Sequence, residues 1–237
     1  MKSVLLTTVS HELGTPLAVI KAAATGLMAD DISAQPEALN DLATSIDVEA
    51  DHLRRLVTDL LDVSRIDGGA LRLSLGWYDV AEFLHEAVAR LRPRLGERQL
   101  LVRAPEDLLV EFDYSLIDRV IDNLVSNAVR YMPPERPVTI EVREAGNQIE
   151  VIVADEGPGI PEAELTRVFE KFHYVEGRPA GIGLGLAICR GIIEAHNGVI
   201  WAESPLAAGR GLAIHLTLPW SRDAVDGLAG ERTEGSE

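Results

Sequence analysis

The 237-residue sequence predicts two structural parts, an all-α helical hairpin and a mixed α/β domain. Apolar residues recur at spacings of three and four through residues 3–28 and again through 36–63, which is the period of amphipathic helices. After Gly68-Gly69 the pattern changes to short alternating strands mixed with helices. We therefore expect the following boundaries: hairpin 1–67, linker 68–78, α/β domain 79–220 and a disordered acidic tail 221–237.

The two long helices justify the hairpin. Val9, Leu13 and Leu17 mark one face of the first helix, and Pro16 should kink it. Pro36 opens the second helix, because proline suits a first helical turn. Since a single hairpin buries one face poorly, two copies should form a four-helix bundle. A hairpin packed only on the rest of its own chain remains the alternative.

The α/β domain follows from shorter signals. A linker or short strand surrounds Trp77. Helices are expected at residues 80–91, 114–131 and 184–195. Strands are expected at residues 99–103, 108–112, 138–142, 149–153, 199–202 and 212–218.

Composition excludes several classes of function. The formal net charge is −16, so the surface would repel a nucleic-acid backbone. No uncharged run reaches 12 residues, so we expect no membrane contact by this chain itself. The single cysteine, Cys189, excludes a disulfide framework and fits a reducing compartment. We therefore expect a cytoplasmic protein.

His11 is the first candidate for chemistry. Helical geometry points it away from the apolar face, and a solitary exposed histidine usually has no function. Its neighbours change that view, because Glu12 could hold one ring nitrogen and leave the other as a nucleophile. Thr15 lies one turn from Glu12 and could orient a water molecule.

Two glycine runs suggest a nucleotide site. The first, Asp155-Glu156-Gly157-Pro158-Gly159, follows a strand, so a carboxylate lies where backbone can approach a flat ligand. The second, residues 181–186 (GIGLGL), opens a helix whose N–H groups could bind an anion. No Gly-Lys-Ser/Thr follows, which excludes a Walker A loop, and the spacing does not fit a dinucleotide fold.

A pair of asparagines adds a candidate metal site. Asn123 and Asn127 lie one turn apart on one helix face, and asparagine is a poor helix former. Carboxamide oxygens suit Mg²⁺, which also binds substrate phosphates. Arg130 lies near the same face and could meet phosphate oxygens. An exposed polar face would explain the asparagines equally well.

Taken together, these motifs resemble those of sensor histidine kinases. The resemblance rests on an H box (residues 10–17, SHELGTPL), an N box (123–131), a first glycine box (155–159), an F box (169–172, FEKF) and a second glycine box (181–186). Residues 60–67 also match the usual end of the dimerisation hairpin. The stretch from Gly185 to Trp201, with Cys189 and His196, is most similar to the potassium-sensor subgroup.

The resemblance implies an ATP-binding domain of the GHKL type, with a mixed sheet covered on one face by helices. Asp155 would accept a hydrogen bond from the adenine amino group, and Asn127, with Asn123 nearby, would bind Mg²⁺. Residues 173–180 would form a lid anchored by Phe169 and Phe172. The full implied set of nucleotide-binding residues is Asn123, Asn127, Arg130, Tyr131, Asp155, Gly157, Gly159, Lys171, Arg178, Gly181, Gly183, Leu184, Gly185 and Leu186.

The implied activity is ATP-dependent autophosphorylation of His11 followed by transfer to an aspartate of a response regulator. The kinase would act as a homodimer, and Glu12 and Thr15 could also support dephosphorylation of the regulator. One alternative is an ATP-binding scaffold or phosphatase-only module. The other is a GHKL ATPase with a conformational cycle, although those enzymes use a glutamate where this chain has Asn123.

Three features depart from the family pattern. Gly14 stands where the family has Arg or Lys, which predicts lower transfer or altered partner contact. Leu212 stands where a small hydroxylic residue often helps bind adenine, which predicts weaker nucleotide affinity. The sequence begins ten residues before His11, as expected for a fragment or a truncated kinase.

Overall fold

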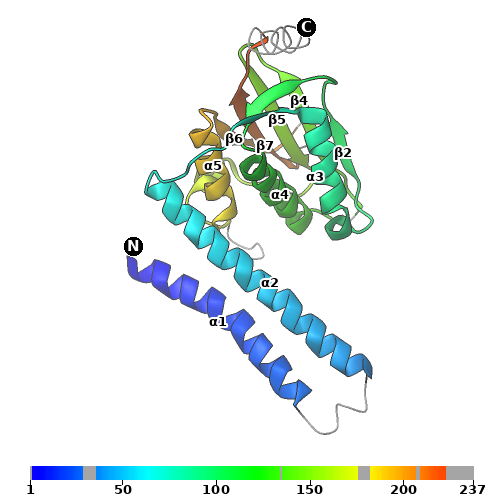
Figure 1. Cartoon of the computed structure of the whole chain (residues 1–237), viewed down its shortest axis with the longest axis vertical. Coiled ribbons are helices and arrows are strands. Elements are labelled where there is room, and N and C mark those ends of the chain that lie inside the picture. The colour runs from blue at the N-terminus through cyan, green and yellow to red at the C-terminus, as the bar shows by residue number, and fades with distance from the viewer. Residues whose placement is uncertain (1, 29–35, 134, 176–181, 207–208, 223–237) are drawn as a thin grey trace, which may run out of the picture.

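A computed structural model describes residues 2–28, 36–133, 135–175, 182–206 and 209–222, with residues 2–8 described by their backbone only. Figure 1 shows a long helical hairpin that extends away from an α/β domain.

The hairpin consists of α1 (Lys2–Leu27) and α2 (Pro36–Asp67). The helix α1 continues through Pro16, whose ring is buried. The two helices pack along each other closely enough that a Cβ on Gly26 would lie 3.1 Å from Leu42 Cδ1. The predicted helical hairpin is therefore confirmed.

The α/β domain begins directly after the hairpin and its short connection. Its helices are α3 (Val80–Leu95), α4 (Tyr114–Tyr131) and α5 (Gly185–Ala195). Two 3₁₀ turns, η2 (Glu162–Glu164) and η3 (Arg167–Phe169), precede α5. Its strands are β1 (Gly76–Asp79), β2 (Leu100–Arg103), β3 (Leu109–Phe112), β4 (Val138–Glu144), β5 (Gln148–Asp155), β6 (Ile200–Glu203) and β7 (Leu212–Pro219).

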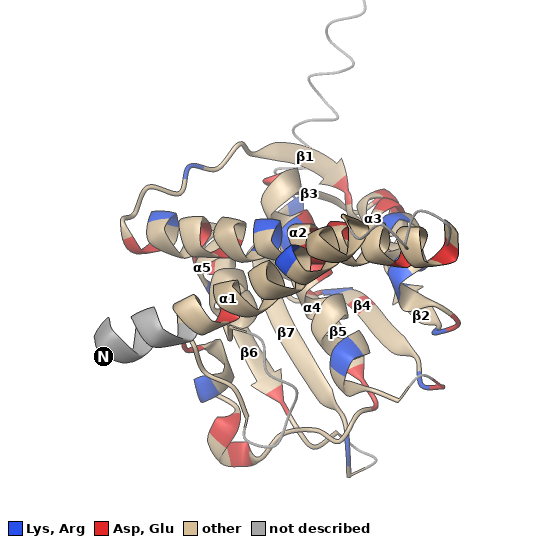
Figure 2. Cartoon of the chain, turned by 90° about the horizontal axis from the view of Figure 1, so that it is seen from below, with Lys and Arg blue, Asp and Glu red and all other residues tan. Residues whose placement is uncertain are grey.

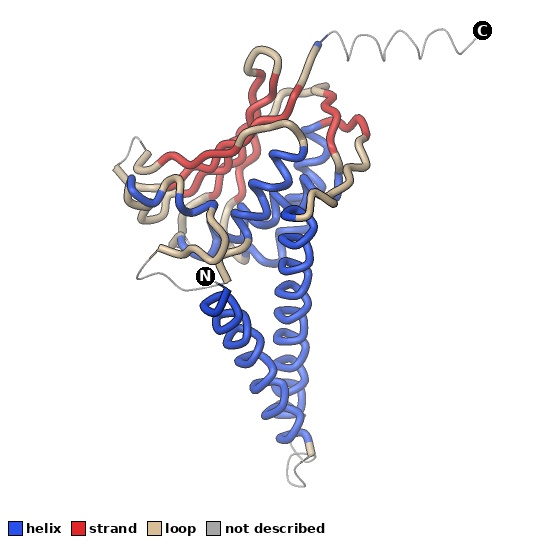
Figure 3. Tube along the Cα trace, turned by 90° about the vertical axis from the view of Figure 1, so that its left-hand side faces the viewer, coloured by secondary structure: helices blue, strands red, loops and turns tan. Residues whose placement is uncertain are grey.

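The strands form a five-stranded sheet and a separate two-stranded ribbon. The order in the larger sheet is β2-β4-β5-β7-β6, and β2 runs parallel to β4 while the other neighbours are antiparallel. The ribbon pairs β1 with β3. Helices α3, α4 and α5 cover one face of the large sheet, as Figure 3 shows, which confirms the predicted two-layer arrangement.

Two aspartates begin the helices of this layer. Asp79 caps α3 by accepting a hydrogen bond from the Glu82 N–H at 2.8 Å. Asp113 caps α4 through Oδ1, which accepts from the Leu116 N–H at 3.1 Å. Its second oxygen, Oδ2, accepts from the N–H of Ser74 in the connecting segment at 2.7 Å. Asp113 therefore ties the connection to the helix that carries the two asparagines.

The C-terminal part of α2 packs against α5 and α4. Arg119 of α4 ion-pairs with both Asp59 (2.6 Å) and Asp62 of α2. Ile66 occupies the space beside Gly191, where a Cβ would lie 2.5 Å from Ile66 Cγ2. Figure 2, viewed from the hairpin, shows α2 passing over these two helices. This end of α2 thus packs on the α/β domain of its own chain. None of the described helices has the length and apolar character of a bilayer-spanning segment.

Candidate functional site

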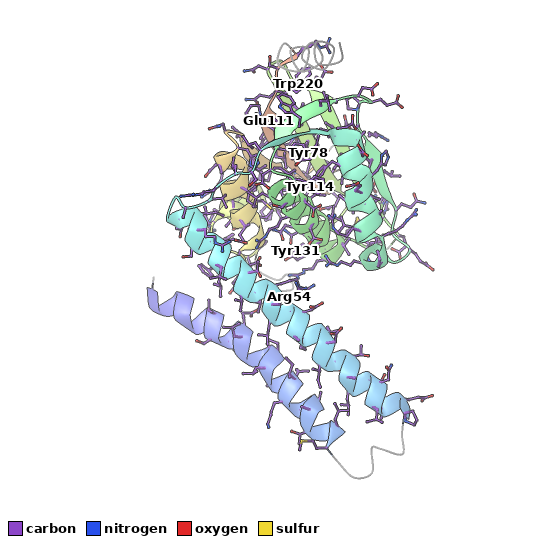
Figure 4. All side chains as sticks on the ribbon, in the orientation of Figure 1. Arg54, Tyr78, Glu111, Tyr114, Tyr131 and Trp220 are labelled. Carbon is purple, nitrogen blue, oxygen red and sulfur yellow. The ribbon has the colours of Figure 1, made fainter. Side chains whose placement is uncertain are left out.

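A pocket opens at the ends of α4 and β5, between them and the start of α5. Figure 4 shows Tyr131 at the end of α4 that faces the hairpin, while Glu111 and Trp220 lie at the far end of the domain. The pocket walls come from six separate segments of the chain. They are Leu124, Asn127, Ala128, Tyr131, Val153, Asp155, Pro158, Gly159, Ile160, Val168, His173, Tyr174, Val175, Gly183, Gly185, Leu186, Leu212 and Ile214.

Asp155 is the acidic group of the pocket. It ends β5, is buried, and accepts a hydrogen bond through Oδ1 from the Gly157 N–H at 2.7 Å. Leu212 lies directly opposite it in the register of β5 and β7 and also lines the pocket. A buried carboxylate beside apolar walls is suited to one polar anchor on an otherwise flat, apolar ligand.

The first glycine run forms a tightly packed floor. Gly159 has φ +67°, and a Cβ there would lie 2.5 Å from Ser204 Oγ and 2.8 Å from the Gly211 carbonyl oxygen. The Ser204 hydroxyl donates to that carbonyl at 2.8 Å and accepts from the Ile160 N–H at 2.9 Å. Only glycine fits this position, so the backbone itself forms the surface that a ligand would meet.

Gly183 of the second glycine run packs against the end of the F-box segment (residues 169–172). Gly183 has φ +70°, and a Cβ there would lie 2.5 Å from the His173 carbonyl oxygen. The Phe172 N–H donates to the Gly183 carbonyl at 2.9 Å. Helix α5 then begins at Gly185, which lines the pocket with Leu186. A helix N-terminus beside a pocket favours an anionic ligand group there.

The two asparagines occupy different positions. Asn127 lines the pocket, whereas Asn123 donates from Nδ2 to the Gly185 carbonyl at 3.5 Å and so joins α4 to α5. The described residues contain no group of three or more His, Cys, Asp or Glu side chains that could hold a metal ion. An amide oxygen at Asn127 fits Mg²⁺ that takes most of its ligands from phosphates and water.

Several expected ligand residues lie beside the pocket rather than in its wall. Gly157 holds the Asp155 carboxylate, and Leu184 is buried just before α5. Arg130 is exposed on α4, and Lys171 ion-pairs with Asp67 of α2. Arg178, Gly181 and lid residues 176–180 lie outside the described residues.

His11 lies apart from the pocket, on α1. Its side chain is 79% exposed, and its Nδ1 lies 3.9 Å from Glu12 Oε1. The Thr15 hydroxyl donates to the His11 carbonyl at 3.2 Å. A Cβ on Gly14 would meet no atom within 4 Å, so this glycine is not required by packing.

Most of the apolar lining residues of the pocket were not predicted, Leu186 and Leu212 being the exceptions. Ile160, Val168 and Ile214 line it together with Val153 and Leu124. In the sequence Leu124, Val153 and Ile214 occupy ordinary core-facing positions of an expected helix and two expected strands, and Ile160 and Val168 lie outside every expected element. No local signal separates a pocket wall from a core, so only the positions of the glycine runs could have located them.

Both parts of the chain match known family models. Residues 1–69 match the "His Kinase A (phospho-acceptor) domain", and residues 112–222 match the "Histidine kinase-, DNA gyrase B-, and HSP90-like ATPase". Sensor histidine kinase WalK of Bacillus subtilis is 33% identical over 226 residues, which are 92% of this chain and 36% of WalK. Sensor protein KdpD of Clostridium acetobutylicum is 34% identical over 214 residues, 88% of this chain and 24% of KdpD.

The chain thus spans well under half of the length of these two relatives. Among solved structures, the mycobacterial sensor histidine kinase MprB is 31% identical with a TM-score of 0.55, and the match covers 61% of this chain and 96% of that one. Histidine kinase ThkA in complex with response regulator protein TrrA is 26% identical with a TM-score of 0.67, covering 91% of this chain and 61% of that one. The predicted potassium-sensor subgroup is represented among the relatives by KdpD, and WalK is equally similar. The chain belongs to the sensor histidine kinase family, with a phospho-acceptor hairpin followed by an ATPase-type domain.

Proposed function

We propose that this chain is an ATP-dependent histidine kinase that phosphorylates His11 and passes the phosphoryl group to an aspartate of a response regulator. One observation carries the proposal: a single chain holds an exposed histidine next to a carboxylate and a glycine-built pocket with one buried acid. Neither part alone would identify a kinase, because exposed histidines and apolar pockets are both common.

ATP would bind with its base against the apolar walls and its amino group donating to Asp155. Its phosphates would lie toward Gly183, Gly185 and the first turn of α5, where backbone N–H groups favour anions. Asn127 would hold Mg²⁺, which supplies neutralisation of charge on the phosphate oxygens when bound. The backbone at Gly159, which has no side chain, would let the base approach closely.

His11 would act as the nucleophile through Nε2. Nδ1 faces Glu12, so the neutral tautomer with its proton on Nδ1 leaves the Nε2 lone pair free. This lone pair attacks the γ-phosphorus, the bond to the β–γ bridging oxygen breaks, and ADP leaves. The ring becomes positively charged, and Glu12 accepts the Nδ1 proton. The two atoms are 3.9 Å apart in the structure, so they must move closer together to form this hydrogen bond.

We also propose that the hairpin forms a homodimer. Leu17 on α1 and Leu61 on α2 are 60% and 54% exposed, and Val57 lies one turn before Leu61. Large apolar side chains in such positions are costly in water. A second hairpin would bury them in a four-helix bundle, which is the arrangement that heptad-like spacing favours.

The response regulator is proposed from a relative, since ThkA was solved in complex with the response regulator protein TrrA. Removal of the phosphoryl group from that regulator is a further proposed activity of Glu12 and Thr15. Thr15 currently donates to the His11 carbonyl, so its oxygen keeps lone pairs that can accept a hydrogen bond from water. Because the reaction consumes ATP, we place it in the cytoplasm.

Labelling with γ-³²P-ATP tests the kinase. We expect acid-labile, base-stable label on the parent chain and none on His11→Gln, with ATP binding retained in that variant. Absence of label on the parent together with normal ATP binding would instead identify an ATP-binding scaffold. Release of free phosphate without any protein-bound label would identify an ATPase cycle.

A second experiment addresses the phosphatase activity. Thr15→Ala should slow dephosphorylation of a phosphorylated response regulator while His11 still becomes labelled. A parental rate of dephosphorylation in Thr15→Ala would exclude this role of the hydroxyl.

A further inference from the structure

Lys171 forms an ion pair with the hairpin and belongs to a segment next to the nucleotide pocket. It lies two residues after the end of η3, and its ammonium group ion-pairs with Asp67, the last residue of α2. Two residues later in the chain, His173 lines the pocket. The carbonyl of His173 packs against Gly183 of the second glycine run. Phe172, the residue after Lys171, donates its N–H to the Gly183 carbonyl at 2.9 Å, so Lys171 lies next to the second glycine run while its charge is paired with Asp67 of the hairpin.

We propose that Asp67 and the nucleotide phosphates compete for Lys171, so that triphosphate binding and the ion pair to α2 exclude each other. This inference rests on the proposed ATP site. Lysine carries a single charge on a flexible four-carbon stem, so it can exchange one anion for another without backbone movement. The pair is accessible to water, with side-chain exposures of 35% for Lys171 and 55% for Asp67, so the exchange needs no unpacking of a core.

A second cation, Arg119, forms a more buried contact between the hairpin and the α/β domain. Arg119 pairs with Asp59 and Asp62, and all three side chains are largely withdrawn from water. Burial raises the pKa of Asp59 even though Arg119 opposes that effect. Breaking this cluster would leave buried charges unpaired. Arg119 therefore serves as a permanent contact, and Lys171 is the exchangeable one.

The competition predicts opposite effects of two substitutions. Asp67→Asn removes the competing carboxylate, so a non-hydrolysable ATP analogue should bind about two- to five-fold more tightly, as expected for an exposed ion pair. Lys171→Met should weaken binding of the analogue, and Asp67→Asn should have no further effect in that background. Adenosine lacks phosphates, so its affinity should be the same in the parent and in both variants.

Glu170 and Asp59 provide matched controls. Glu170→Gln removes one negative charge next to Lys171 in the sequence, and among the described residues Glu170 forms no ion pair. It should leave the ratio of analogue to adenosine affinity unchanged. Asp59→Asn weakens the contact between the domains at Arg119 and should also leave this ratio unchanged.

Titration calorimetry on the full chain with the ATP analogue and with adenosine measures all of these affinities. Equal analogue affinity in the parent and Asp67→Asn would overturn the competition while the ATP site stands. An equal gain for adenosine, or for Glu170→Gln, would overturn it as well, because the effect would then be general. If the parent binds neither ligand, the proposed ATP site itself is wrong, and the competition is wrong with it.

Discussion

The backbone N–H of Asp113 donates a hydrogen bond to Nε2 of the buried His196 at 3.0 Å. Nδ1 of the same ring lies 2.8 Å from the Ile192 carbonyl, so the ring carries its proton on Nδ1 and accepts on Nε2. His196 therefore connects the last turn of α5 to the start of α4.

Replacing His196 by Ala should lower the free energy of unfolding by about 1–3 kcal/mol, because the Asp113 N–H loses its partner in a buried position. Urea denaturation followed by circular dichroism measures the change. His85→Ala is the control, since His85 is exposed on α3 and its removal should change stability by less than about 0.5 kcal/mol. Equal effects of the two substitutions would contradict the structural role of His196.

Asp113 should also make the fold acid-sensitive. Burial alone would raise its pKa, but hydrogen bonds from Ser74, Ser115 and Leu116 outweigh burial and hold the pKa below its ordinary value. Because the folded-state pKa is lowered, this stabilisation is complete above the unfolded-state pKa of about 4 and is lost as pH falls through the lower folded-state value. Asp113→Asn should therefore show a smaller loss of stability between pH 5 and pH 3 than the parent. Parallel pH curves for the two proteins would show that Asp113 does not contribute.

Cys189 should be unreactive in the folded chain. The thiol is fully buried, and burial raises its pKa to about 12, so almost no thiolate exists at neutral pH. We expect no labelling by iodoacetamide at pH 8 until urea unfolds the domain. Rapid labelling without denaturant would mean that α4 and α5 separate readily in solution.

Gly183→Ala should abolish nucleotide binding while most of the domain remains folded. A Cβ there would collide with the His173 carbonyl, and the positive φ adds strain. Gly146→Ala is a matched control, since Gly146 has φ +69° but no atom within 4 Å of an added Cβ. We expect the control to bind nucleotide normally and to lose only about 1 kcal/mol of stability. Thermal denaturation and calorimetric titration distinguish the two outcomes, and normal binding in Gly183→Ala would contradict the proposed role of this loop.

Gly14→Ala should stabilise α1 by about 1 kcal/mol, since glycine is a poor helix former and the added Cβ meets open space. The melting temperature of the chain measures this gain. Gly26→Ala is the comparison, because its Cβ would press on Leu42 at 3.1 Å and offset the same gain in helix propensity. A loss of stability in Gly14→Ala would show that the local conformation near Pro16 requires glycine.

The sequence predicted the long, periodic elements better than the ends of elements. The helix expected at residues 114–131 matches α4, whereas α3 continues to Leu95 because this buried leucine extends the packed face beyond Pro93. Strands β4 and β5 run past the predicted limits into the polar residues Arg143 and Gln148, because ladder hydrogen bonding continues up to the turn. The parallel pairing of β2 with β4 depends on long-range contacts that no local pattern encodes.

In the functional site, too, some features were predictable from the sequence and others were not. Backbone constraints at Gly159 and Gly183 were predictable because only glycine tolerates those conformations. The contact of Lys171 with Asp67 was not predictable, since it joins residues 104 positions apart across two domains. Charge patterns in a sequence show that cations are available but not which anion each one meets.

The double role of Asp113 limits how freely the two parts of this chain can be exchanged with those of other proteins. One carboxylate oxygen begins α4 and the other fixes the segment that arrives from the hairpin. A chimera that joins this hairpin to a foreign domain without an acid at that position would therefore lose the hydrogen bond that fixes the connecting segment to the start of α4. A fusion that keeps residues 68–113 intact would preserve both hydrogen bonds of Asp113.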